Sequence, residues 1–180
     1  MKQKIILYIA MSIDGFIATP DLSVNWLDKY NNSGDDFGYN QFIKNIDTQI
    51  LGETTYNQFK EVYNNENKLN TIVFSKNKTS TDNNNNNNNN KLKFVNQTPT
   101  QLINSLDKNT HKNIWIVGGA NITNQFLKEN LIDEIILSIM PEILGSGIRL
   151  FSNDNNISNI FKLKNINKFK KNVIQLHYTK

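Results

Sequence analysis

The stretch Ile114–Leu127, with the sequence IWIVGGANITNQFL, decides the fold of this 180-residue chain. Four apolar residues, Ile114–Val117, run directly into Gly118 and Gly119, and a segment with helical spacing follows. An unbroken apolar run is typical of a strand in a parallel sheet, and two glycines let the backbone approach a ligand closely. Amide groups at the start of the helix then bind phosphate well. The stretch predicts either a nucleotide site at the carboxyl end of a strand or an ordinary strand-to-helix turn.

Apolar runs alternate with segments of helical spacing on both sides of this stretch. We expect strands at Lys4–Ala10, Gln49–Leu51, Asn70–Phe74, Leu92–Val95, Asn113–Val117 and Glu134–Met140. We expect helices at Asp35–Ile46, from about Thr54, at Thr100–Leu106 and at Asn121–Lys128. An irregular loop, Thr19–Ser33, separates the first strand from the first helix. The alternation predicts one α/β domain over residues 1–180 with a mostly parallel sheet, and Ile160–Tyr178 predicts a terminal antiparallel hairpin.

Composition narrows the classes of function. The chain has no cysteine, which excludes disulfide scaffolds and thiolate metal sites, and its two histidines lie far apart, so we expect no metal. The run Asn83–Asn90 predicts a disordered loop at about residues 77–91. The net charge of +4 rests almost entirely on lysine. The densest basic segment, Lys162–Lys171, fits an exposed strand edge, and RNA binding there is the alternative. We expect a cytoplasmic protein without a membrane or nucleic-acid partner, because no stretch is long enough to span a membrane.

Three predicted strands end in small or hydroxyl residues. These ends are Gly52 with Thr54 and Thr55, Ser75 with Lys76, and Gly118 with Gly119. Hydroxyls, backbone amides and a single cation at neighbouring strand ends favour binding of a dinucleotide. Neither G-x-G-x-x-G nor G-x-x-x-x-G-K-[ST] is present, so the sequence predicts a mode of binding different from that of the Rossmann fold.

Four segments carry a resemblance to a known superfamily. They are Ala10–Ala18 (AMSIDGFIA), Ile50–Tyr56 (ILGETTY), Ile116–Leu127 (IVGGANITNQFL) and Pro141–Phe151 (PEILGSGIRLF). Together they resemble the dihydrofolate reductase-like superfamily, and especially the reductase domain of riboflavin biosynthesis, which is the C-terminal part of bacterial bifunctional deaminase-reductases. The resemblance implies a three-layer fold with helices on both faces of the sheet. It also implies a homodimer.

The resemblance further implies a set of cofactor-binding positions. Gly118 and Gly119 would flank the cofactor and are often joined by a cis peptide bond in this superfamily. The remaining positions would contact the phosphates, the adenosine ribose or the nicotinamide, and they are Ala10, Ala18, Gly52, Thr55, Ser75, Lys76, Ala120, Asn121 and Thr123.

Glu53 departs from the pattern of the family, which commonly has arginine at this position in contact with the 2′-phosphate of NADPH. A glutamate repels that phosphate, whereas Lys76 could pair with it. We therefore expect NADPH as the cofactor, with NADH as the alternative that Glu53 leaves open.

The candidate catalytic residue is Asp36. An ungapped count back from Gly52 places Asp36 at the position of the dihydrofolate reductase carboxylate, and its alternative role is to cap a helix. The candidate substrate-binding residues are Asp14, Trp26, Gly145 and Gly147. For Asp14 a turn is the alternative, and for Trp26 it is simple core packing.

The resemblance implies an NAD(P)H-dependent reductase. The first substrate hypothesis is 5-amino-6-(5-phosphoribosylamino)uracil, whose ribose would be reduced by hydride from the nicotinamide. Reduction of dihydrofolate, of another pterin, or of a small carbonyl or imine compound is the alternative, in which Asp36 would matter more. A non-catalytic nucleotide-binding homologue is the second alternative, and Glu53 is the residue that most supports it.

Overall fold

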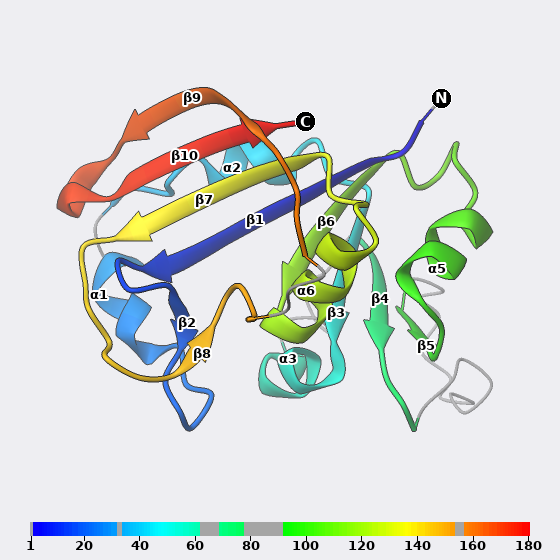
Figure 1. Cartoon of the computed structure of the whole chain (residues 1–180), viewed down its shortest axis with the longest axis horizontal. Helices are drawn as coiled ribbons and strands as arrows, with labels where there is room; N and C mark the ends of the chain where they lie inside the picture. Colours follow the sequence, from blue (N-terminus) through cyan, green and yellow to red (C-terminus); the bar gives the residue numbers. More distant parts are fainter. Residues whose placement is uncertain (1, 32–33, 62–68, 78–91, 154–156) are drawn as a thin grey trace.

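The strand that contains the apolar run, β6 (Asn113–Gly118), lies in the middle of an eight-stranded sheet (Figure 1). The computed structural model describes residues 2–31, 34–61, 69–77, 92–153 and 157–180. The strand order is β5-β4-β3-β6-β1-β7-β10-β9. The other strands of the sheet are β1 (Lys4–Ser12), β3 (Thr48–Gly52), β4 (Asn70–Phe74), β5 (Leu92–Val95), β7 (Glu134–Met140), β9 (Lys162–Lys168) and β10 (Ile174–Thr179).

The sheet is mostly parallel, as the alternating pattern predicted. Strands β5, β4, β3, β6, β1 and β7 pair in parallel, whereas β10 is antiparallel to both β7 and β9. The predicted C-terminal hairpin is therefore confirmed as β9 and β10. A separate small sheet pairs β2 (Phe16–Ala18) with β8 (Ile148–Arg149), and the sequence pattern did not predict either of these short strands.

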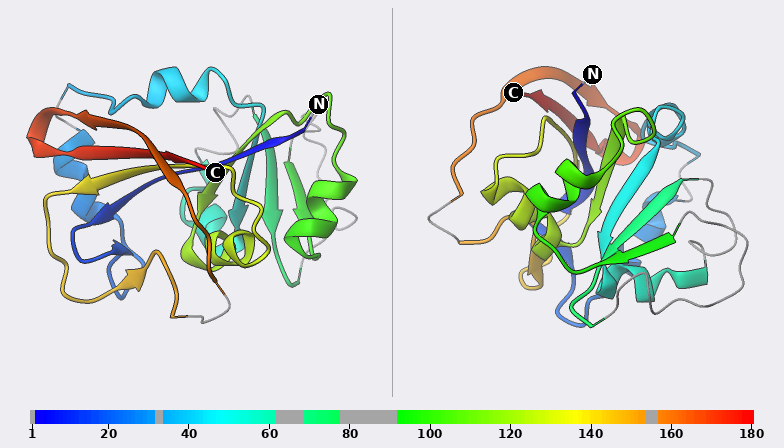
Figure 2. Two further views of the ribbon diagram at one scale, coloured as in Figure 1. Left: turned by 45° about the horizontal axis from the view of Figure 1, so that its top comes forward. Right: turned by 90° about the vertical axis from the view of Figure 1, so that its right-hand side faces the viewer.

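Helices cover both faces of the sheet (Figure 2). Helices α5 (Pro99–Ser105) and α6 (Ala120–Lys128) pack on one face, where Ile50 of β3 joins the main core. On the other face lie α1 (Asp28–Asn31), α2 (Tyr39–Ile43) and α3 (Glu53–Gln58). Successive strand residues point to opposite faces, so the neighbouring Leu51 packs instead with Tyr56 of α3. The predicted three-layer arrangement is confirmed.

Two predictions of local structure were wrong in extent. The helix predicted at Asp35–Ile46 is only α2, because Gly38 at its N-cap has φ +84°, a left-handed conformation outside the helical region. After Ile43 the chain continues in short turns instead of helical hydrogen bonds. The loop predicted at Thr19–Ser33 contains a short 3₁₀ helix, Asn25–Leu27, followed directly by α1.

The predicted disordered loop at residues 77–91 lies outside the described residues except for Asn77. Within the described part of the chain, no helix combines the length and the apolar character that crossing a membrane requires.

A buried carboxylate on β7 contacts side chains of both neighbouring strands, β1 and β10. Glu134 on β7 is 8% exposed, and its Oε1 lies 2.7 Å from the Nζ atom of Lys4 while its Oε2 lies 3.1 Å from Nε2 of His177. Burial alone raises the pKa of Glu134, but the hydrogen bonds from Lys4 and His177 outweigh it, so the pKa lies below its ordinary value of 4.5.

We predict that Glu134→Gln lowers the free energy of unfolding at neutral pH by about 1–3 kcal/mol. A carboxyl whose pKa is depressed by folding contributes stability that is complete above pH 4.5 and is lost as the pH falls through the folded-state pKa. Urea denaturation as a function of pH checks this. The curves of the two proteins should converge in acid, and Glu61→Gln, at an exposed glutamate, should leave the profile unchanged. Parallel curves at all pH values would contradict the assignment.

Candidate functional site

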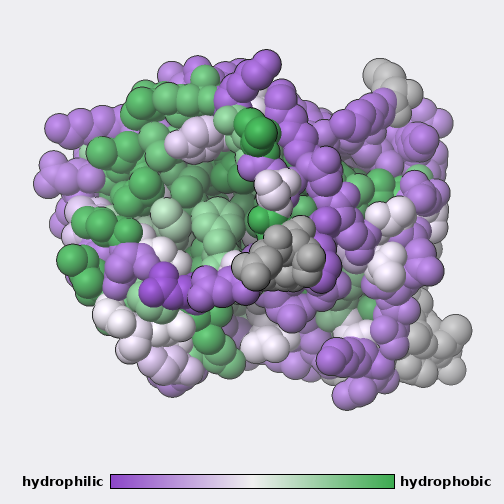
Figure 3. Space-filling view, viewed as in Figure 1, coloured by the Kyte–Doolittle hydropathy of each residue, from purple (hydrophilic) through white to green (hydrophobic). Residues whose placement is uncertain are grey.

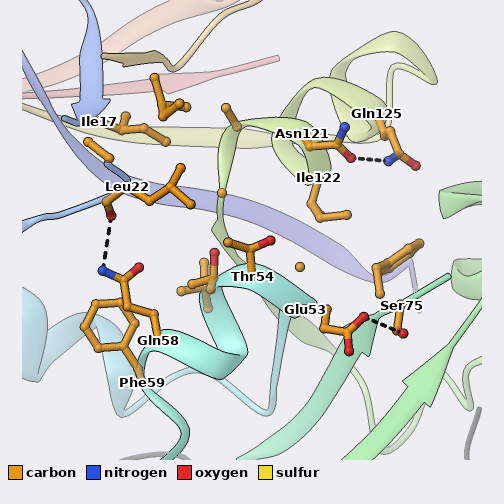
Figure 4. Close-up of a pocket in the computed structure, with 18 of the residues that line it drawn as sticks. Ile17, Leu22, Glu53, Thr54, Gln58, Phe59, Ser75, Asn121, Ile122 and Gln125 are labelled. Carbon is orange, nitrogen blue, oxygen red and sulfur yellow. Dashed lines mark hydrogen bonds between the residues drawn. The ribbon is translucent and has the colours of Figure 1, made fainter. Parts of the chain in front are cut away.

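A cavity of about 790 Å³ opens at the carboxyl ends of five neighbouring parallel strands, β5, β4, β3, β6 and β1 (Figure 4). Parallel strands bring their carboxyl ends to one edge of the sheet, which is where α/β proteins bind ligands. Nine of the residues that the sequence singled out as cofactor-binding line this cavity. They are Ala10, Ala18, Gly52, Thr55, Ser75, Lys76, Gly119, Ala120 and Asn121.

Gly119, the second residue of the glycine pair, is part of the cavity wall. The peptide bond between Gly118 and Gly119 is cis, as the resemblance implied, and Gly118 has φ +120°. A Cβ atom added to Gly119 would lie 3.5 Å from Oγ1 of Thr55, so a side chain there would narrow the space between α6 and α3. Gly119 is also the N-cap of α6 and has no side chain to accept from the first amides of that helix.

The other two predicted cofactor-binding residues, Gly118 and Thr123, are not part of the lining. Thr123 is fully buried in α6, and its Oγ1 has no hydrogen-bond partner among the described residues. The side chain of Asn121 is held by Gln125, whose Nε2 donates to its Oδ1 over 2.7 Å (Figure 4).

A carboxylate and a hydroxyl lie at the end of the cavity formed by β3 and β4. The Ser75 hydroxyl donates to Oε2 of Glu53 over 2.7 Å (Figure 4), and it accepts a hydrogen bond of 3.2 Å from the amide of Asn77. Ser75 is 6% exposed, so the bond holds Glu53 against a buried group.

A second cavity, of about 530 Å³, adjoins the first. The two share Leu27 and Ala10, which lies two residues before the end of β1. Most of the other lining residues are aromatic or acidic, and they include Tyr8, Tyr30, Asp35, Asp36, Phe37 and Tyr39. No lysine or arginine belongs to this lining within the described residues.

Buried polar groups form the floor of the second cavity. Gln175 donates from Nε2 to Oγ of Ser138 and to the carbonyl of Phe37, both at 3.0 Å, and the Tyr8 hydroxyl donates to the same carbonyl at 2.9 Å. Burial raises the pKa of Tyr8 to about 12, so its phenol stays protonated. The sequence analysis missed these residues. The signal was Tyr8, a polar aromatic two positions before Ala10 and therefore on the same face of β1.

Asp36 borders the second cavity from the turn before α2. Its carboxylate accepts hydrogen bonds of 3.0 Å from the amides of Gly38 and Asn40. These bonds hold the pKa of Asp36 below its ordinary value, so the side chain is ionised at neutral pH. The geometry is that of the helix-capping alternative, and a role in proton transfer stays a prediction.

The four predicted substrate-binding residues line neither cavity. Asp14 instead holds the loop after β7, because its carboxylate accepts from the amides of Leu144 at 3.1 Å and Gly145 at 2.7 Å. Gly147 has φ +143°, and an added Cβ would lie 2.1 Å from the carbonyl oxygen of Ala18. Trp26 is half-buried beside Tyr30 of α1. Their roles toward a substrate stay predictions.

The fold and the site define an α/β protein with a ligand cavity across the carboxyl ends of a parallel sheet. The chain belongs to the RibD C-terminal domain family, whose model matches residues 3–175.

Two proteins of Bacillus subtilis (strain 168) are similar to this chain along nearly their whole length. The uncharacterized protein YwjB is 38% identical over 183 residues, which are 100% of this chain and 99% of YwjB. The uncharacterized protein YyaP is 32% identical over 185 residues, which are 98% of this chain and 95% of YyaP.

Solved structures share the fold at low sequence identity. A putative riboflavin biosynthesis protein from Shewanella sp. PV-4 is 24% identical with a TM-score of 0.84, over 98% of each chain. A diaminohydroxyphosphoribosylaminopyrimidine deaminase/5-amino-6-(5-phosphoribosylamino)uracil reductase from Thermotoga maritima is 15% identical with a TM-score of 0.71, over 99% of this chain and 56% of its own. Dihydrofolate reductase from Enterococcus faecalis, solved in complex with NADP(H), is 13% identical with a TM-score of 0.63. The match covers 98% of this chain and 95% of the reductase. The predicted dihydrofolate reductase-like fold is thereby confirmed.

We predict that Asp14→Ala frees the loop after β7. Without the carboxylate, the amides of Leu144 and Gly145 lose their acceptor, so their hydrogen exchange should accelerate on the order of tenfold. Amide exchange followed by NMR measures this. Asp21→Ala, which removes an exposed acid elsewhere in the chain, is the control and should leave both amides unchanged. Equal protection in the Asp14 variant would show that other contacts hold the loop.

Proposed function

We propose that this single domain is a reductase that uses a nicotinamide dinucleotide and acts on a small heterocyclic substrate. The observation that carries the proposal is the junction of the two cavities at Ala10. The larger cavity is long enough for an extended ligand, since its wall spans five neighbouring strands. The second cavity meets the larger one at one end only. This arrangement suits hydride transfer from a dinucleotide in the larger cavity to a substrate in the second. Membership in the RibD C-terminal domain family supports the same assignment.

The residues present fit a dinucleotide. Gly119 leaves room that a Cβ would occupy beside Thr55, and the uncapped amides of the nine-residue helix α6 face the same wall. Such amides bind phosphate oxygens. We place the pyrophosphate there, the nicotinamide near Ala10 and Ala18, and the adenosine near Ser75 and Asn96, because these residues line opposite ends of the cavity.

The contribution of the chain is to position two reactants and to exclude water. The bound cofactor supplies hydride to the substrate. Ala10 has no bulky side chain, so the wall at the junction is thin, and the apolar residues Ile9 and Ile17 flank it. Tyr8 stays protonated and fixes the floor of the second cavity. Asp36, which is ionised, would order water at the rim instead of donating a proton itself.

The first substrate candidate is 5-amino-6-(5-phosphoribosylamino)uracil, as the resemblance implied. The family supports it, because the Thermotoga maritima neighbour is named as a reductase of that compound. A flat heterocycle without phosphate, such as a dihydropterin, is the second candidate. The acidic lining of the second cavity favours it, since Asp35 and Asp36 repel phosphate and aromatic side chains stack on planar rings.

Two measurements test this function. Reduced nicotinamide dinucleotides are titrated against the protein by calorimetry, and the loss of nicotinamide absorbance is then followed with each candidate substrate. We expect saturable binding and turnover of one of the two. If binding occurs without turnover of any heterocyclic carbonyl or imine, the protein is a nucleotide-binding homologue. If neither dinucleotide binds, the reductase proposal fails.

We predict that a side chain at Gly119 blocks cofactor binding in proportion to its size. Gly119→Ala should weaken dinucleotide binding about tenfold and Gly119→Val a hundredfold or more, because the added methyl groups enter the space beside Thr55. Calorimetric titration measures the affinities. Thermal melting serves as the control and should change little, since Gly119 has φ −70°, which other residues adopt readily. Unchanged affinity in the valine variant would place the dinucleotide elsewhere.

We also propose that two copies of the chain pair through an apolar face of the sheet. Figure 3 shows a broad apolar area over β1 and β7, beside the part of the sheet that α6 covers. Ile166 of β9, 56% exposed, pairs with Leu176 of β10, which in turn pairs with Leu137 of β7. Paired residues share a face, so this apolar surface extends to the edge strand.

We predict that Ile166→Glu converts the proposed homodimer into a monomer, because it would place a charge on the apolar surface through which the two copies pair. Light scattering coupled to size-exclusion chromatography gives the mass. Asn165→Glu is the matched control, since the adjacent side chain on β9 points to the opposite face. A wild-type monomer at micromolar concentration would contradict the proposal.

A further inference from the structure

We propose that Glu53, held in place by Ser75, makes this site select NADH over NADPH. The inference rests on the proposed function, because it concerns which dinucleotide the larger cavity accepts. Glu53 begins α3 at the end of β3, and Ser75 follows the end of β4. Both residues line the cavity at the end formed by β3 and β4. A hydrogen bond of 2.7 Å joins their side chains there (Figure 4).

The position of the pair along the sheet assigns it to the adenosine end of the ligand. In the strand order, β4 lies three strands from β1, which is about 14 Å at the usual spacing between strands. The wall of α6 and Gly119 lies between them, at the end of β6. A dinucleotide with its phosphates at α6 and its nicotinamide at Ala10 therefore has its adenosine ribose beside Glu53 and Ser75.

The bond to Ser75 fixes where the negative charge lies. Ser75 is 6% exposed, its amide donates to the carbonyl of Val95 over 2.9 Å, and its hydroxyl is directed at Glu53. A fixed carboxylate accepts hydrogen bonds from the hydroxyls of an unmodified ribose, whereas it repels a phosphate on the 2′ oxygen. Within the described residues, Glu53 is the acidic residue of the lining and Lys76 is its basic residue. The side chain of Glu53 is held by Ser75, whereas Lys76 is exposed.

Affinities of both cofactors for four proteins test the proposal. By calorimetry at low salt, the wild type should bind NADH at least about tenfold more tightly than NADPH. Glu53→Gln should bring the ratio of the two affinities close to one, because it removes the charge but keeps the shape. Glu53→Arg should reverse the preference, and Ser75→Ala should narrow it. Glu61→Gln, a change of an exposed glutamate outside the lining, should leave the ratio as in the wild type.

Two further arms separate the possible outcomes. The preference of the wild type should shrink as salt rises, because it rests on repulsion between charges near the surface. Lys76→Ala should weaken NADPH binding more than NADH binding, because it removes the cation of the lining that could pair with the 2′-phosphate. If the wild type binds both cofactors equally or prefers NADPH, or if Glu53→Gln leaves the ratio unchanged, the selectivity is refuted while the reductase proposal stands. If neither cofactor binds the wild type or any variant, both proposals fail together.

Discussion

The parallel pairing of β6 with β1 on one side and β3 on the other is the constraint on which the rest of the structure depends. It buries Ile114 and Ile116 completely and sets the ends of three strands beside one another. The glycine pair then turns the chain into α6 at the one place where cavity, helix and neighbouring strand ends meet. Every group to which we assign a role in cofactor binding lies at or near this edge of the sheet.

The two cavities differ in the forces that they offer a ligand. The larger cavity combines backbone amides, hydroxyls and apolar side chains, with its fixed negative charge at one end. The second is aromatic and acidic and rests on a buried network around Gln175. Apart from Ala10 and Leu27 the two linings have no residue in common, so a change elsewhere in one lining leaves the residues of the other unchanged. The solved structures compared share the fold at 13–24% sequence identity.

Much of this could be predicted from the sequence, and the exceptions have physical causes. Long apolar runs are typical of buried strands, so the central sheet and the turn at Gly118 and Gly119 were predicted closely. Short strands such as β2 and β8 are held by each other and by turns, and their few residues carry no periodicity. The second cavity was missed because its floor joins Tyr8, Ser138 and Gln175, which lie far apart in the chain. Asp14 pairs with a loop about 130 residues away, which local turn chemistry does not reveal.

The strand order also governs how the molecule must assemble. Lys4 at the start of β1 pairs with Asn113, and Ile6 pairs with Glu134, so the first strand made is enclosed by strands made more than a hundred residues later. Pairings this distant in sequence slow folding, because the chain must close a long loop before any contact compensates for the lost entropy. During synthesis the apolar strand β1 therefore stays without its partner strands until the ribosome has made β6 and β7. The centre of the finished sheet is thus completed late, and until then its apolar first strand is exposed to aggregation.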